Sequence, residues 1–294
     1  MNAKDIVFLF AICAGCDAQY SASSMSPKTS RFSSNSEAET IGIVQVHEDT
    51  LDWDEADSIA FGWWEDEWYT TIDSQTVPLV LLPTLTYDNW KNHLIRRRDS
   101  LKTRYELAGS DSGRMAVLKE AEKCLLNNLV NGIIPHWYGT PWEFNGHTDV
   151  PGEGEIACGY FVSTTLLHAG FNLNRYKLAQ QSAYNEIKTL QTTGSVHKLI
   201  NKDVDELVEL AQSSLKEGLY VIGLDFHVGY LLKWKEEVYF VHSNYWYPSQ
   251  VIVEYAKTSV ALMGSASYYI GEVTTNKALL KKWLFNTRIS IVMD

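Results

Sequence analysis

The chain has few cysteines and few positively charged residues, and each shortage excludes certain kinds of site or partner. Four cysteines in 294 residues are too few for a disulfide framework, and no pair has histidines nearby at metal-ligand spacing, so we expect no metal site. There is no glycine-rich phosphate loop either, and we expect no cofactor. Lysine and arginine total 25 against 36 acidic residues, a formal net charge of −11 at pH 7. Such a chain is poorly suited to a phosphate backbone, so we expect no nucleic-acid partner.

The first sixteen residues have the features of a targeting segment. Ile6 to Ala14 is an apolar run that is too short to span a bilayer as a mature helix but has the length of a signal-peptide core. It ends in Cys13-Ala14-Gly15-Cys16, which resembles the processing box of bacterial lipoproteins, although that box prefers leucine where Cys13 stands. The resemblance implies that Cys16 becomes the lipid-carrying first residue. We interpret residues 1–16 as a lipoprotein signal peptide, with a simple secretory signal as the alternative.

Two further segments precede the main domain. Residues 17–40 are rich in serine and cannot bury enough apolar area to order themselves, so we interpret them as a flexible tether. Residues 41–110 form an N-terminal region whose role the sequence does not indicate. Within it we expect strands at Ile41–Val46 and Val77–Leu82, and a helix that begins at about Tyr87.

Residues 111–294 are predicted to form one domain that opens with a long helix. This helix is expected to end at the C-cap pair Asn131-Gly132, and Cys124 beside its apolar stripe is expected in the core. A strand at Val251–Tyr255 and a helix at Asn276–Phe285 are predicted near the end of the domain. The stripe of the first helix consists of Met115, Leu118, Ala121, Leu125 and Leu129.

A cysteine stands at the start of a predicted helix in the middle of this domain. Gly152 and Gly154 interrupt regular structure just upstream, and apolar residues recur at helical spacing from Cys158 to a glycine cap at Gly170. Backbone N–H groups and the positive end of the helix dipole favour a thiolate at such a position. Cys158 is therefore a candidate nucleophile. The alternatives are a small buried residue, or a disulfide with Cys124 that would silence it.

Two histidines lie on a predicted hairpin that follows. His227 is in one strand and His242 in the next, joined by a short polar connection at Lys233 to Glu237. If the turn is symmetric about Trp234-Lys235, His227 directly faces His242, and opposed side chains share a sheet face about 4.5–5.5 Å apart. A nucleophilic thiol needs a base and a residue that orients the base, and this pair fits both roles.

The combined motifs resemble those of the NlpC-type cell-wall peptidases, a papain-like cysteine peptidase family. That family has a Gly-Thr-Pro-Tyr stretch, then a cysteine that opens a helix, then a His-Val-Gly strand and a Phe-Val-His-Ala/Ser strand. This chain has Gly139-Thr140-Pro141-Trp142, Cys158, His227-Val228-Gly229 and Phe240-Val241-His242-Ser243 in the same order. The similarity covers about residues 137 to 254, with a long intervening segment from 171 to 216.

The resemblance implies a role for each matching residue. Cys158 corresponds to the nucleophile, His227 to the general base and acid, and His242 to the orienting residue. Tyr138, Trp142 and Gly159 would belong to the substrate-binding or oxyanion region, where the N–H of Cys158 holds the oxyanion. The implied reaction is acyl transfer from an amide carbonyl through a thioester to water.

Three departures from the family pattern leave alternatives open. Ala157-Cys158-Gly159 stands where the family has Asp-Cys-Ser, so the contact with a free amino group of the substrate is in question. Trp142 replaces a tyrosine, and indole can only donate a hydrogen bond. Asn244 is an alternative orienting residue, since papain-like enzymes use a Cys-His-Asn arrangement.

From these observations we expect an α+β, papain-like domain in which the helix bearing Cys158 packs on an antiparallel sheet bearing the histidines. We expect a cysteine amidase or endopeptidase of the bacterial cell envelope, lipid-anchored on the periplasmic or outer side or secreted, with peptidoglycan peptides as substrate. The alternatives are an amide hydrolase or transferase that acts on another protein or a small amide, and a non-catalytic envelope protein. The ten tryptophans and sixteen tyrosines would serve such a protein to bind glycan or peptide.

Overall fold

A computed structural model describes residues 69–72, 75–78, 85–191 and 196–293 of the chain. The expected signal peptide with Cys16, the tether and the expected strand at Ile41–Val46 lie outside these residues. No helix in the described part is both long and apolar enough to cross a membrane. The described elements, in chain order, are β1 (Tyr69–Ile72), β2 (Gln75–Pro78), α3 (Tyr87–Leu107), α4 (Asp111–Asn128), α5 (Cys158–His168), α6 (Arg175–Ala179), α7 (Ala183–Leu190), β3 (His197–Ile200), α8 (Val204–Ser214), β4 (Gly218–Gly223), β5 (Val228–Trp234), β6 (Glu237–Ser243), β7 (Val251–Tyr255), α9 (Val260–Met263), β8 (Ser267–Glu272) and α10 (Lys277–Leu284).

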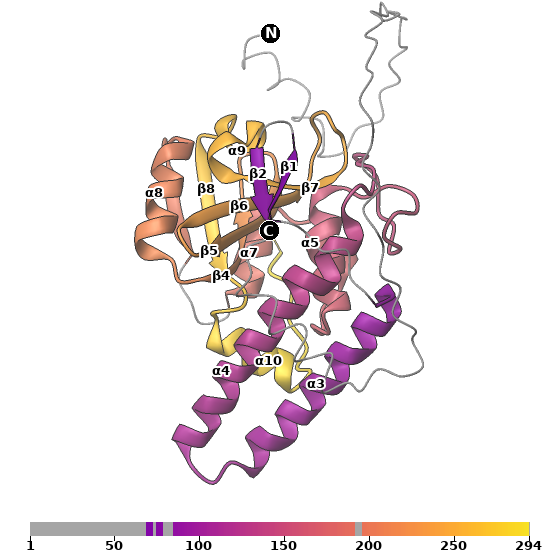
Figure 1. Ribbon diagram of the computed structural model, residues 1–294, viewed down its shortest axis with the longest axis vertical. Coiled ribbons are helices and arrows are strands. Elements are labelled where there is room, and N and C mark those ends of the chain that lie inside the picture. The colour runs from indigo at the N-terminus through magenta and orange to yellow at the C-terminus, as the bar shows by residue number, and fades with distance from the viewer. Residues whose placement is uncertain (1–68, 73–74, 79–84, 192–195, 294) are drawn as a thin grey trace, which may run out of the picture. The chain divides into compact units, whose positions relative to one another are not determined.

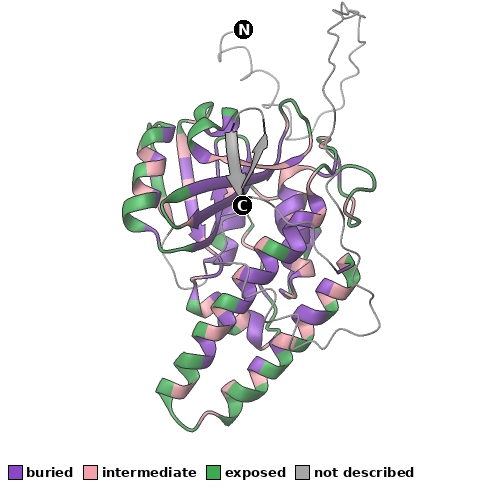
Figure 2. Ribbon diagram, viewed as in Figure 1, coloured by how far each residue is buried: buried purple, intermediate pink, exposed green. Residues whose placement is uncertain are grey.

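Six of the strands form one antiparallel sheet in the order β3-β8-β4-β5-β6-β7, and β1 pairs separately with β2 (Figure 1). This confirms the expected α+β class with an antiparallel sheet. The central strands are buried along almost their whole length (Figure 2). Strands buried on both faces need helices on both sides, because neither face can be left to water.

The two faces of the sheet pack against different helices (Figure 1). Tyr230 of β5 points toward α5, and its hydroxyl lies 2.7 Å from Thr165 Oγ1 and donates to the carbonyl of Val162 at 3.0 Å. Leu231 and Phe240 point to the other face, where they pack in the cluster that includes residues of α8. Successive side chains along a strand alternate between faces, so residue parity fixes which helix each one meets.

The helix that opens the main domain differs in part from the prediction. It begins at Asp111 with Ser110 as its N-cap, and the chain does not end it at Gly132: a π-helical turn runs over Leu129–Ile133 and a 3-10 turn over Ile134–Trp137. Gly132 is needed for close approach, because a Cβ there would lie 2.7 Å from the Trp90 ring. Cys124 is buried as predicted, whereas Met115 is 42% exposed and does not belong to the packed stripe.

The ends of the main domain follow the prediction closely. β7 covers Val251–Tyr255, and α10 buries Leu280 and Trp283 against the core. Within the domain, α8 begins with a capping box, in which Asp203 Oδ1 accepts the Glu206 N–H and Glu206 Oε2 accepts the Asp203 N–H. The expected strand at Val77–Leu82 overlaps β2 at Val77 and Pro78, and its residues 79–82 lie outside the description.

Candidate active site

Cys158 is the first residue of α5, as the sequence predicts. The preceding turn contains Gly152 and Gly154, both with positive φ, 76° and 71°, which glycine adopts readily. The N–H of Ala157 donates to the carbonyl of Gly146 at 2.8 Å and ties the turn to the incoming loop. The helix then ends at His168, two residues before Gly170, whose φ is +90°. Neither Cys158 nor Cys124 is in a disulfide, so the alternative of a bridge between them is not realised.

The ionisation of Cys158 differs from the sequence-based expectation. The residue is half-buried, and backbone N–H groups near its sulfur, that of Val228 among them, favour the thiolate. These donors lower the pKa of the thiol, but burial, and the negative charge that Glu186 carries when it is ionised, outweigh them and raise the pKa to about 11. The helix start therefore does not by itself produce a thiolate in this site.

The two histidines lie in direct contact. His227 comes immediately before β5 and His242 is in β6, and His227 Nε2 lies 2.8 Å from His242 Nδ1. The expectation that these residues face each other directly is wrong, because Trp234 pairs with Glu237 and Tyr230 pairs with Val241. The turn is thus Lys235-Glu236, and the register is shifted by two residues. A shift of two preserves the sheet face, which is why the histidines still meet.

Gly229 makes room for this contact. A Cβ at Gly229 would lie 2.8 Å from the Cβ of His242 and 2.7 Å from Cε2 of Phe240. The absence of a side chain at this position lets the His242 ring stack on Phe240, with centroids 4.0 Å apart. The glycine of the His-Val-Gly motif is therefore explained by close packing across the β5–β6 pair.

A carboxylate that the sequence analysis missed, that of Glu254, extends the two histidines into a hydrogen-bonded row. His242 Nε2 lies 3.0 Å from Glu254 Oε1, and Glu254 is in β7 opposite Phe240. Burial, together with the charge of His242, lowers the pKa of His227 well below its ordinary value. Burial also lowers the pKa of His242, although Glu254 opposes that shift. Both rings are therefore neutral at pH 7, with one N–H each.

The row of hydrogen bonds fixes where those protons are. A carboxylate only accepts, so His242 donates from Nε2 to Glu254 and its Nδ1 is an acceptor. His227 must then donate from Nε2 to His242 Nδ1. The remaining ring nitrogen of His227, Nδ1, carries a free lone pair, which is the property that a general base needs.

The thiol and the imidazoles reach the site from opposite faces of the sheet. α5 packs on the Tyr230 face, and on that face Ser243 donates from Oγ to the carbonyl of Ile156 at 2.6 Å. His242, one residue earlier, projects from the other face, beside Phe240. The backbone N–H of Val228, the first residue of β5 and the neighbour of His227 in the chain, is near enough to the Cys158 sulfur to lower the pKa of the thiol.

The other predicted site residues lie around this centre. The N–H of Trp142 donates to the carbonyl of Ser249 at 2.9 Å, and the Trp142 ring lies 6.2 Å from the ring of Tyr245. The Tyr245 ring in turn lies 5.0 Å from His227. Sequence analysis missed Tyr245, although it belongs to an aromatic run with Trp246 just after β6.

Tyr138, Gly159 and Asn244 have structural environments of their own. Tyr138 packs against the main core, and burial raises the pKa of its hydroxyl. Gly159 faces α7, since a Cβ there would lie 2.7 Å from Glu186 Oε1. Asn244 Oδ1 accepts the N–H of Trp246 at 3.0 Å, so this amide is bonded within its own turn.

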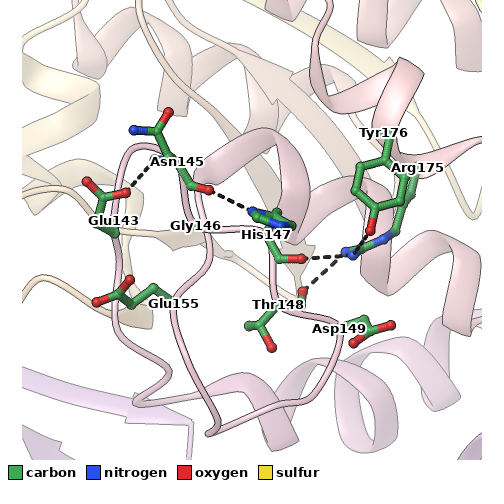
Figure 3. Close-up of a pocket in the computed structure, with 9 residues that line it drawn as sticks. All are labelled: Glu143, Asn145, Gly146, His147, Thr148, Asp149, Glu155, Arg175 and Tyr176. Carbon is green, nitrogen blue, oxygen red and sulfur yellow. Dashed lines mark hydrogen bonds between the residues drawn. The ribbon is translucent and has the colours of Figure 1, made fainter.

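A cavity of about 510 Å³ lies beside the loop that leads to Cys158 (Figure 3). Arg175, which is 6% exposed, holds the cavity wall by donating to the carbonyls of His147 and Thr148 and to Thr164 Oγ1. In the described part of the chain no cluster of acidic, histidine and cysteine side chains is arranged to hold a metal ion. The lining residues are Glu143, Asn145, Gly146, His147, Thr148, Asp149, Glu155, Arg175 and Tyr176.

Comparisons with known proteins do not identify the chain. No family model, no curated protein and no solved structure matches it.

Proposed function

We propose that this protein is a papain-like cysteine hydrolase that cleaves an amide or peptide bond with Cys158, His227 and His242. The observation that carries the proposal is the row His227–His242–Glu254, because it leaves a lone pair on His227. His227 is next in the chain to Val228, whose N–H is near the Cys158 sulfur. Burying two histidines costs free energy of folding, and a defined tautomer of His227 is a functional reason for that cost.

The first step is attack of the Cys158 sulfur on the amide carbonyl. Because the pKa of the free thiol is about 11, the proton leaves with the help of a base as the bond forms. His227 Nδ1 takes the S–H proton, the sulfur adds to the carbonyl carbon, and the carbonyl electrons move to oxygen. The resulting imidazolium then gives its proton to the leaving amine, and a thioester to Cys158 remains.

Water completes the reaction. His227, again neutral, takes a proton from a water molecule as its oxygen attacks the thioester carbonyl, and the proton passes to the departing sulfur. The carboxylic acid product is released, and the thiol of Cys158 is restored. The N–H of Cys158 at the start of α5 and a donor from the Trp142 region are the groups proposed to hold the oxyanion in both steps.

His242 is the proposed orienting residue. Its contact with His227 at 2.8 Å fixes the tautomer, and Glu254 behind it offsets the positive charge that His227 acquires. Asn244 is less suited to the role, since its amide oxygen already accepts the Trp246 N–H.

Peptidoglycan peptides are the proposed substrate, in the envelope of a bacterium. Support comes from the resemblance to NlpC-type peptidases and from the lipoprotein-like segment that ends at Cys16. The ring of Tyr245 lies beside His227, and the rings of Trp142 and Trp246 lie beside Tyr245. This group suits a substrate that carries sugar, since flat aromatic faces with polar edges stack on such groups.

A non-catalytic binding protein is the second candidate. The raised pKa of Cys158 favours it, because an inactive site has no need to lower that pKa. The same aromatic rings would then hold a glycan or peptide without cleaving it.

Digestion of purified peptidoglycan decides between the two. Wild type and a Cys158→Ala variant are incubated with intact sacculi and with soluble muropeptides, and the products are identified by mass spectrometry. Cys124→Ala is the matched control, since Cys124 is a buried cysteine outside any disulfide. New peptide ends with wild type and Cys124→Ala, but not with Cys158→Ala, support hydrolysis. Identical product profiles for all three proteins contradict it, and retained binding in that case supports the binding protein.

A further inference from the structure

A buried carboxyl group that the proposed reaction does not use lies behind the first turn of α5. Glu186 of α7 is 1% exposed, and its Oε2 atom has no hydrogen-bond partner in the described part of the chain. An ionised carboxylate in such a place is strongly unfavourable, so the group holds a proton instead. Burial accordingly raises the pKa of Glu186 well above its ordinary value.

Three glycines fix the position of this side chain. α7 lies directly on the sheet, because a Cβ at Gly223 of β4 would come within 2.8 Å of the Ala183 Cβ, and one at Gly271 of β8 within 2.5 Å of Ile187 Cγ2. At the other contact, a Cβ on Gly159 would lie 2.7 Å from Glu186 Oε1. The same Cβ would lie 2.8 Å from the carbonyl oxygen of Ala179, so only glycine fits at position 159. This packing explains why glycine stands there.

The charged and titratable groups around Glu186 show how it acts. On α5 its charge raises the pKa of Cys158, and on β5 it raises the pKa of Tyr230. On α6, the guanidinium of Arg175 is hydrogen-bonded to the backbone of the loop at His147 and Thr148. Cys158 and Tyr230 both become negative when they lose a proton. An ionised Glu186 therefore opposes the formation of a negative sulfur.

We propose that Glu186 is a positioning residue of the Cys158 site: as a neutral acid it supports the first turn of α5 through Gly159, and on losing its proton it suppresses the Cys158 thiolate. The inference rests on the proposed function, in which Cys158 is the nucleophile. It assigns a role to a carboxyl group that lies behind the start of α5 and outside the His227–His242–Glu254 row.

The test measures the reactivity of Cys158 without any substrate. The rate of alkylation of Cys158 by iodoacetamide is followed as a function of pH in the full chain, by mass spectrometry of the peptide that contains it. In Glu186→Gln, which keeps the shape and cannot ionise, the curve moves to lower pH and alkylation at a fixed alkaline pH becomes faster by about threefold or more. Glu122→Gln is the control, because the carboxyl group of Glu122 also has a pKa raised by burial but faces Lys216 and Lys277.

The control curve is expected to coincide with that of wild type. Coincidence of the Glu186→Gln curve with wild type overturns the proposal. If Glu186→Gln does not fold, the wild-type protein labelled with 13C in its glutamate carboxyl groups gives the answer by NMR: the Glu186 signal stays constant between about pH 5 and 8. Titration of that signal at an ordinary carboxyl pKa overturns the proposal as well.

Failure of this inference is distinguishable from failure of the proposed function. Products that do not change in Cys158→Ala, together with a shifted Glu186→Gln alkylation curve, refute the hydrolase alone. Loss of products in Cys158→Ala, together with an unshifted curve, refutes the role of Glu186 alone.

Discussion

His227 Nε2 and His242 Nδ1 lie 2.8 Å apart, although the two residues are not a directly paired couple of their strands. Their rings meet edge to face with centroids 5.0 Å apart. The diagonal contact is possible because Gly229 has no side chain that would collide with His242. Since Glu254 accepts from the far side of His242, the protons of both rings are ordered in one direction.

Glu254→Gln is expected to lower activity without loss of fold. An amide both donates and accepts, so it no longer dictates the tautomer of His242, and the lone pair on His227 is lost in part of the molecules. We expect kcat for muropeptide hydrolysis to fall by at least about tenfold, with little change in KM. Steady-state kinetics measure this, with Glu209→Gln on the exposed side of α8 as control. Unchanged kcat would remove Glu254 from the proposed mechanism.

Gly229→Ala is expected to reduce stability. The added methyl group would overlap Phe240 and His242, which lie within 2.7 Å and 2.8 Å of its position, and a packed sheet has little room to adjust. We expect a loss of about 1–3 kcal/mol in the free energy of unfolding. Urea unfolding measures it, and Gly109→Ala is the matched control because nothing lies within 4 Å of a Cβ there. Equal losses in both variants would contradict the packing argument.

Stability is expected to fall on acidification. Tyr87 Oη accepts the indole N–H of Trp137 and therefore donates to His168 Nδ1 at 2.8 Å. Burial, above all, lowers the pKa of His168 from 6.5 to about 4. Between these values the unfolded chain binds a proton that the folded chain does not, so the free energy of unfolding falls as pH drops from 6.5 to about 4.

Urea unfolding at several pH values between neutral and acid measures this slope. In His168→Gln the amide oxygen can still accept the hydrogen bond of the Tyr87 hydroxyl, but the side chain does not titrate. The slope of its free energy of unfolding against pH is therefore expected to be smaller than that of wild type. His227 and His242, whose pKa values are also lowered, contribute the same sign and remain in the variant. Stability that rises on acidification would show the sign to be wrong.

Lipid attachment at Cys16 is expected in a bacterial host. The segment Cys13-Ala14-Gly15-Cys16 resembles a lipoprotein processing box, so metabolic labelling with a fatty acid should mark the wild-type protein and not Cys16→Ala. Cys13→Ala is the control for a change of cysteine number in the same segment. Absence of label from wild type would favour a simple secretory signal.

Local patterns were enough to predict several elements of the fold. The glycines before Cys158 and the apolar spacing after it predicted α5, and the alternating strand at Val251–Tyr255 and the amphipathic pattern near the C-terminus predicted β7 and α10. Each of these depends on residues close in the chain. The hairpin register was wrong by two residues because the turn Lys235-Glu236 has no Asn-Gly or Asp-Gly pair to identify it.

The sequence by itself determined the class of the domain, the cysteine at a helix start and the face that the two histidines share, because all three follow from spacing along the chain. The tertiary structure decided the charge state of the site. Glu254 and Glu186 reach His242 and Gly159 from elements distant in sequence, and desolvation depends on every neighbour at once. For this reason no local pattern showed that burial would raise the pKa of Cys158 where the helix start alone favours a thiolate.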